Sequence, residues 1–216
     1  MMKYFFCLLL FYSINVVADD SQELAKLLVE YKTIQGDFEQ SLQDSKGEII
    51  QESSGIFTIK SPGYFLWDTQ APFPQLLVSN LQDIWLYDPD LEQVTIRPYS
   101  ESVDQSPALL LSGNIEKISQ TYRIKKTSNV NKDNSTSSEK LVNITSYFVL
   151  TPKQANSVFI ELQLGFIDNT IQQMTLADSL GQTTRFTFSN VVLNQLINEE
   201  IFEFSIPSGV DVLIDK

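Results

Sequence analysis

The chain has no histidine, and its only cysteine is Cys7. These absences exclude Ser-His-Asp and Cys-His nucleophiles and imidazole-based zinc sites. Glycines are few and scattered singly, so no glycine-rich phosphate loop is present either. We therefore expect no metal site and no cofactor, and we expect an apolar core without disulfides to supply the stability.

Positive charge is also scarce. Fifteen Lys and Arg residues face 27 Asp and Glu residues, which gives a formal net charge of −12. Phosphate backbones and anionic lipid surfaces attract basic patches, so neither nucleic acid nor an anionic membrane surface is an expected partner.

Long apolar runs are absent apart from residues 4–12, which follow Lys3 and precede the small residues Val16 to Ala18. This run is shorter than the roughly 20 residues that a membrane span needs. The pattern predicts a secretory signal peptide at residues 1–18 that is cleaved after Ala18. Residues 19–216 are then long enough for one domain with a sizeable core, located outside the cytoplasm.

Two helical segments stand out. Residues 21–34 carry Leu24, Leu27, Leu28 and Tyr31 at helical spacing after a capping-box pattern, which predicts an amphipathic helix. Residues 106–113 begin with Ser-Pro, continue with a leucine run and end in glycine, which predicts a short apolar helix. Residues 127–140 are polar without periodicity and predict an exposed loop.

Most other segments predict strands. Apolar and polar residues alternate in several of them, and the last expected strand is residues 201–206. In residues 157–166 the alternation puts Ile160, Leu162, Leu164 and Phe166 on one face. Regular short strands without intervening long helices indicate an antiparallel sheet that curls.

Two strands are apolar on both faces. Residues 64–68 read YFLWD and residues 84–88 read IWLYD, whereas a half-solvated strand should have one polar face. An ordinary core on both sides of the sheet would explain this pattern. An apolar ligand cavity on the concave side of a curved sheet would explain it as well, and composition does not separate the two.

Because acidic residues lie on several expected strands, a pair of catalytic carboxylates like that of a glycosidase must be considered. Glu39, Glu161 and Glu203 lie at the polar positions of alternating strands, where solvated side chains are expected. We therefore favour a solvated face over catalytic carboxylates, and we expect no enzyme.

Several motifs in a shared order resemble one protein family, that of the periplasmic outer-membrane lipoprotein carrier proteins, the LolA family. The resemblance covers almost all of residues 19–216. Its motifs are GDFEQ at 36–40, KSPGYFLW at 60–67, LVS at 77–79, LQDIWLYDP at 81–89, Ser106-Pro107 with its leucine run, FVLTPK at 148–153 and FEFSIPSGVDV at 202–212.

The resemblance implies an unclosed antiparallel β-barrel with a helical lid over an apolar cavity. The second apolar face of the two strands would line that cavity. A monomeric carrier would take acylated lipoproteins from an inner-membrane ABC transporter and deliver them to an outer-membrane lipoprotein receptor. The lipid-binding residues implied by the match are Phe65, Trp67, Leu77 and Trp85 on strands and Leu109, Leu110 and Leu111 in the lid.

One position departs from the family. The family usually has Arg before the proline of the aromatic stretch, where it can hydrogen-bond the lid shut, and this chain has Ser61. Lys60 should point to the other face of the strand, so we expect a lid that closes less firmly. A carrier or sensor of free lipid or glycolipid remains the alternative function. A lipid-anchored receptor of similar fold is disfavoured because no cysteine follows the signal.

Overall fold

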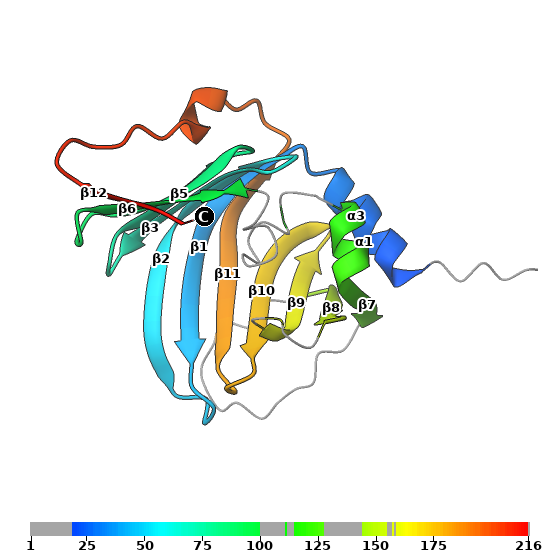
Figure 1. Cartoon of the computed structure of the whole chain (residues 1–216). Coiled ribbons are helices and arrows are strands. Elements are labelled where there is room, and N and C mark those ends of the chain that lie inside the picture. The colour runs from blue at the N-terminus through cyan, green and yellow to red at the C-terminus, as the bar shows by residue number, and fades with distance from the viewer. Residues whose placement is uncertain are drawn as a thin grey trace, which may run out of the picture.

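The computed structural model describes residues 19–99, 111, 115–127, 144–154, 157 and 159–215. In this part of the chain, twelve strands form one sheet in the order β12-β6-β5-β4-β3-β2-β1-β11-β10-β9-β8-β7. Neighbouring strands are antiparallel except β12, which is parallel to β6. The sheet curls without closing (Figure 1), which confirms the predicted unclosed half-barrel.

Few helices interrupt the succession of strands along the described chain, as expected for a mainly β fold. The helices are α1 (Asp20–Val29), α3 (Ile115–Thr121) and the 3₁₀ helix η2 (Glu199–Phe202). The strands are β1 (Thr33–Gln43), β2 (Ile49–Lys60), β3 (Tyr64–Ala71), β4 (Gln75–Asn80), β5 (Asp83–Asp88), β6 (Gln93–Pro98), β7 (Tyr122–Thr127), β8 (Ser146–Pro152), β9 (Phe159–Ile167), β10 (Thr170–Asp178), β11 (Thr183–Leu193) and β12 (Asp211–Ile214).

The β9–β10 hairpin illustrates how the local sequence makes the sheet. Asp168 and Asn169 both have positive φ, as a two-residue type I′ turn requires. Leu162, Leu164 and Phe166 are fully buried, as the alternation predicted. Ile160 is exposed instead, because the β9–β10 register shifts where it stands and a bulge turns its side chain outward.

Helix α1 is shorter than predicted but begins and packs as its sequence indicates. The carboxylate of Asp19 accepts a hydrogen bond from the backbone N–H of Ser21 and caps the helix. The stripe of Leu24, Leu27 and Leu28 is buried. Figure 1 places α1 and α3 beside β7 to β10, on the concave side of the sheet.

The C-terminal segment differs from the prediction. Residues 201–206 do not form a strand; η2 ends at Phe202, and the chain then runs irregularly to β12. Phe202 is fully buried and Phe204 contacts rings of β5, so these phenylalanines pack down onto the sheet rather than extend it. Figure 1 shows this segment crossing above β3 to β6 on the convex side.

Some predictions lie outside the described residues: the signal peptide at 1–18, Leu109 and Leu110 of the lid, and nearly all of the polar loop. Among the residues that the structure does describe, no helix has the length and apolar character needed to span a bilayer.

Candidate functional site

The concave side of the sheet holds a group of aromatic side chains that we call the inner aromatic cluster. Trp67 stacks on Phe38 with their ring centroids 4.2 Å apart, and it meets Phe186 edge-on at 5.4 Å. Cross-strand pairing places all members on the same face of the sheet. The cluster consists of Phe38, Phe57, Phe65, Trp67, Phe186 and Phe188.

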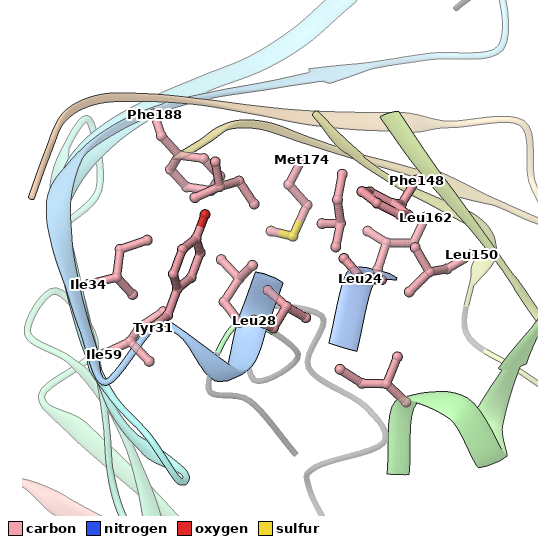
Figure 2. Packing of buried hydrophobic residues seen from close by; sticks show 14 of the residues in the cluster. Leu24, Leu28, Tyr31, Ile34, Ile59, Phe148, Leu150, Leu162, Met174 and Phe188 are labelled. Carbon is pink, nitrogen blue, oxygen red and sulfur yellow. The ribbon is translucent and has the colours of Figure 1, made fainter. Parts of the chain in front are cut away.

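Helix α1 covers the part of the concave face next to this cluster. Figure 2 shows Leu24 beside Leu150 and Leu162, and Leu28 near Met174. Tyr31, just after the helix, lies between Ile34 and Ile59 on one side and Phe188 on the other. Phe188 in turn contacts Phe57 and Trp67. The helix and the inner aromatic cluster therefore belong to one continuous apolar interior.

Polar contacts fix both ends of α1. At its start, the Asp20 carboxylate accepts the backbone N–H of Lys126 at 2.9 Å, and the Lys126 ammonium pairs with Glu23. At its end, the Tyr31 hydroxyl donates to the carbonyl of Asn169. Burial raises the pKa of Tyr31 far above its ordinary value. The helix is thus a cover whose ends are held by a few polar contacts.

Phe65, Trp67 and Leu77, three of the residues implied by the resemblance, share the concave face. Phe65 is fully buried and Trp67 is 8% exposed, and Leu77 is the cross-strand neighbour of Trp67. Leu111 is buried in the same apolar interior. Leu109 and Leu110 lie outside the described residues.

Trp85 lies on the opposite face of the sheet. Its cross-strand neighbours are Val78 and Ile96, and its ring packs near Phe204 of the C-terminal segment at 6.4 Å. We call this convex group the outer cluster. Its members are Tyr64, Val78, Trp85, Tyr87, Val94, Phe202 and Phe204.

The outer cluster corrects one inference drawn from the two-faced strands. The second apolar face of β3 and β5 does not line a concave cavity, because the C-terminal segment covers it. Trp85 therefore does not share the surface of Phe65 and Trp67, and we leave it out of the proposed lipid-binding set.

Under helix α1 the described side chains of the concave side pack closely. A cavity of about 10 Å³ lies between α1, α3 and β7, lined by residues that include Leu24, Leu28 and Ile118. This is the space of about one water molecule, far below that of an acyl chain. The rings of the inner aromatic cluster contact one another, so a bound chain must displace part of this packing.

Two carboxylates considered in the sequence, Glu39 and Glu161, are not set opposite one another. Glu39 and Glu161 project from the convex face, and their cross-strand neighbours are Ser54, Thr187 and Ala177 rather than other acids. Within the described ranges, no group of acidic residues is arranged to hold a metal ion. The inner aromatic cluster offers apolar contact to a ligand.

The sequence matches a family model described as outer membrane lipoprotein carrier protein LolA over residues 30–205. An outer-membrane lipoprotein carrier protein of Hahella chejuensis is 40% identical over 190 residues, which are 88% of this chain and 86% of that protein. A protein of the same name from Pseudomonas aeruginosa strain UCBPP-PA14 is 40% identical over 199 residues, 91% of this chain and 89% of that protein. The chain belongs to the LolA family.

A solved structure of an uncharacterised conserved protein from Thermus thermophilus has the same fold. It superposes with a TM-score of 0.54 at 11% identity and covers 92% of this chain and 99% of that one. This likeness supports the half-barrel architecture of the LolA family member and nothing finer.

Ser61, which stands where the resemblance leads us to expect the arginine of the LolA family, lies in the turn between β2 and β3. Its backbone N–H donates to the carbonyl of Lys32 at 2.9 Å. The side chain of Lys60 points to the convex side, where it pairs with Glu199 and lies over the ring of Tyr64. Lys60 thus does not take the place of the missing arginine.

Phe38, Phe57, Phe186 and Phe188 belong to the site but were not predicted as site residues. Alternation put Phe186 and Phe188 on one face, yet only the cross-strand register shows that they meet Trp67. The pairing of β1 with β11 joins residues about 150 positions apart, for example Phe38 with Phe188. A pattern within one strand carries no signal for such a contact.

Proposed function

We propose that this protein is a periplasmic carrier of acylated lipoproteins. It takes their acyl chains from an inner-membrane ABC transporter and delivers them to an outer-membrane receptor. The working protein is a monomer of one domain, residues 19–216, after removal of a signal peptide at 1–18. Its relatives carry the name outer-membrane lipoprotein carrier protein at about 40% identity, which supports the assignment.

One observation carries the proposal: the apolar concave face is covered by a helix rather than by another sheet. A covering sheet would be held in place by hydrogen bonds among its own strands, so one part of it could not move away alone. Helix α1 is held by the contacts of Asp20, Glu23 and Tyr31 at its ends and by its apolar stripe. Displacing the helix exposes apolar surface that an acyl chain can cover again.

The energies of the two states are close enough for reversible loading. Each buried methylene contributes about 0.8 kcal/mol, so a chain of a dozen carbons gains roughly 10 kcal/mol before ordering costs. Withdrawing Leu24, Leu27 and Leu28 costs roughly 5–9 kcal/mol at about 1.5–3 kcal/mol for each buried leucine. The closed state therefore lowers the apparent affinity, and the cargo stays releasable.

No covalent step is part of this function. The residues of the inner aromatic cluster are apolar, and the role of the protein is to bind, shield and release. The energy for loading comes from the transporter upstream.

The two tryptophans offer a direct test, because they lie on opposite faces of the same sheet. The variant Trp85→Phe leaves Trp67 as the only tryptophan, and Trp67→Phe leaves only Trp85. A lipopeptide with brominated acyl chains quenches a tryptophan on contact. We expect strong quenching in the Trp85→Phe protein and little in the Trp67→Phe protein.

Equal quenching of the two proteins, or quenching of Trp85 alone, would contradict acyl-chain binding at the inner aromatic cluster. Circular dichroism and an unfolding curve for each variant establish that both remain folded during the measurement.

Native mass spectrometry of the protein isolated from the periplasm distinguishes the cargo. A co-purifying triacylated protein supports the lipoprotein carrier. A bare phospholipid or glycolipid instead identifies a carrier or sensor of free lipid with the same binding face.

A further inference from the structure

Strand β12 forms one edge of the sheet, and only its alternate residues bond to the neighbouring strand β6. Asp211 donates its N–H to the carbonyl of Glu92 at 2.8 Å, and Asp215 donates to Ile96 at 3.0 Å. In a parallel ladder, alternate residues bond to the same neighbour. The backbone groups of Val212 and Ile214 therefore point away from β6, and in the part of the chain that the structure describes no strand pairs with them.

The opposite edge, β7, is guarded. The Asp20 carboxylate of α1 accepts the N–H of Lys126, which is an outward-facing backbone group of that edge. Arg123 and Lys125 add exposed charges to the same strand. Natural sheets protect their edges by coverings and charges of this kind, since an open edge invites pairing with another chain.

Among the described residues, nothing covers the outer side of β12, and its charges lie only at its two ends, at Asp211 and Asp215. The side chains of its last three residues are apolar and exposed: Val212 at 43%, Leu213 at 50% and Ile214 at 67%. Leu91, in the turn beside the start of the strand, is also exposed. Exposed apolar side chains next to unused backbone groups are typical of a surface that another chain covers.

The charges around the start of β12 restrict what that chain can be. Asp90, Glu92 and Asp211 are exposed there, and Arg97 pairs with Asp215 at the far end of the strand. An acidic surface repels anionic lipid headgroups.

We propose that β12 is a docking edge for a partner protein that adds an extended strand to this sheet. The strand hydrogen-bonds to the backbone of Val212 and Ile214 and places apolar side chains beside those of β12. It carries lysine or arginine where it passes Asp90, Glu92 and Asp211. Main-chain hydrogen bonds give such strand addition its affinity, and side chains give it specificity.

The inference concerns a partner surface on the edge of the sheet and is independent of what the inner aromatic cluster binds. Hydrogen exchange of the free protein is the first test. The amide of Leu213 should be protected by its bond to β6, whereas those of Val212 and Ile214 should exchange rapidly. Equal protection of all three amides would mean that another part of this chain covers the edge, and it would overturn the proposal.

The second test titrates the ¹⁵N-labelled protein with a synthetic seven-residue peptide of alternating valine and threonine with a lysine at each end. We expect amide shifts confined to β12 and the β5–β6 turn. A peptide with glutamate at both ends should bind several-fold more weakly. The absence of shifts in β12, or shifts centred on the concave face, would overturn the proposal, as would concentration-dependent self-association through this edge.

A matched pair of variants isolates the backbone contribution. Val212→Pro removes an outward N–H that makes no bond to another described strand, and proline is tolerated at such edge positions. Val212→Thr keeps the N–H and the β-branched shape. We expect Val212→Pro to weaken peptide binding about fivefold or more relative to Val212→Thr. Equal affinities would overturn strand addition.

Asp211→Lys provides a readout that does not depend on tolerance of proline, because Asp211 is exposed and its substitution should leave folding intact. The variant should lose affinity for the lysine peptide and gain affinity for the glutamate peptide. An unchanged preference would contradict the role of the acidic end of β12.

Discussion

The sheet carries apolar layers on both faces of β3 to β6, and the two layers are covered differently. The outer cluster lies under the C-terminal segment, whose Phe202 is fully buried among the side chains of β3 and β4. The inner aromatic cluster adjoins an interior covered by α1, a helix held at its ends by polar contacts. We infer that the outer layer is a permanent core and that the inner layer can open.

Phe202→Ala should break the outer layer and have the largest effect on stability. Removing a fully buried phenylalanine costs about 3–5 kcal/mol, and Phe202 has no exposed surface. Urea unfolding measures the loss. The neighbouring Ile201 is 38% exposed, so Ile201→Ala should cost far less.

Phe202→Ala also tests whether the two layers are independent of each other. At temperatures where Phe202→Ala remains folded, acyl-chain binding should be unchanged, because the outer cluster lies on the face opposite the proposed binding face. A stability loss near that of Ile201→Ala would show that the convex layer is not a core.

Ser61→Arg should act on the inner layer alone. A charged hydrogen bond is worth about 1.5–3 kcal/mol. A guanidinium that bonds to the expected lid at residues 106–113 should therefore lower the occupancy of the open state by roughly 10- to 100-fold. Binding of an apolar dye to the empty protein reports that occupancy. Ser61→Ala, which adds no donor, should bind the dye like the unmodified protein, and equal dye binding by Ser61→Arg would contradict the latch.

The two layers also differ in how well they could be predicted from the sequence. Alternation and the family motifs predicted the half-barrel and the shared face of Phe65 and Trp67. Alternation reports that a strand has two apolar faces but not what covers each of them. The position of Trp85 under Phe204 depends on the path of the last twenty residues, which no periodicity encodes.

Two local departures from the regular pattern could not be predicted from the sequence either. The register shift at Ile160 inverts the faces of β9 at that point, and the pattern of residues 201–206 resembles a strand although Phe202 ends a 3₁₀ helix. In both places tertiary packing decides against the local periodicity. The packing of the inner aromatic cluster likewise depends on long-range register, for example that of Phe38 with Phe188.

Tyr31→Phe tests the polar contact at the end of α1. Loss of the hydrogen bond to Asn169 should cost about 1 kcal/mol at neutral pH. Burial raises the pKa of Tyr31 above its ordinary value of 10.0. The unfolded chain therefore loses this proton first as the pH rises, and the folded state loses relative stability above pH 10.

The phenylalanine variant lacks this titration. Its disadvantage in the free energy of unfolding should be full below pH 10 and should shrink as the pH rises further, which urea unfolding at several pH values will measure. A gap that stays constant or widens would mean that the Tyr31 hydroxyl is not buried in the closed state.

The ion pair of Lys60 with Glu199 should contribute least. It ties η2 to β2 at the rim of the outer cluster, but the Glu199 side chain is 62% exposed. Exposed pairs contribute about 0–1 kcal/mol and weaken with salt. A double-mutant cycle with Lys60→Ala and Glu199→Ala should give a coupling at the lower end of that range. A larger, salt-independent coupling would mean that this ion pair, and not Phe202 alone, holds the C-terminal segment on the sheet. Both layers would then depend on polar contacts.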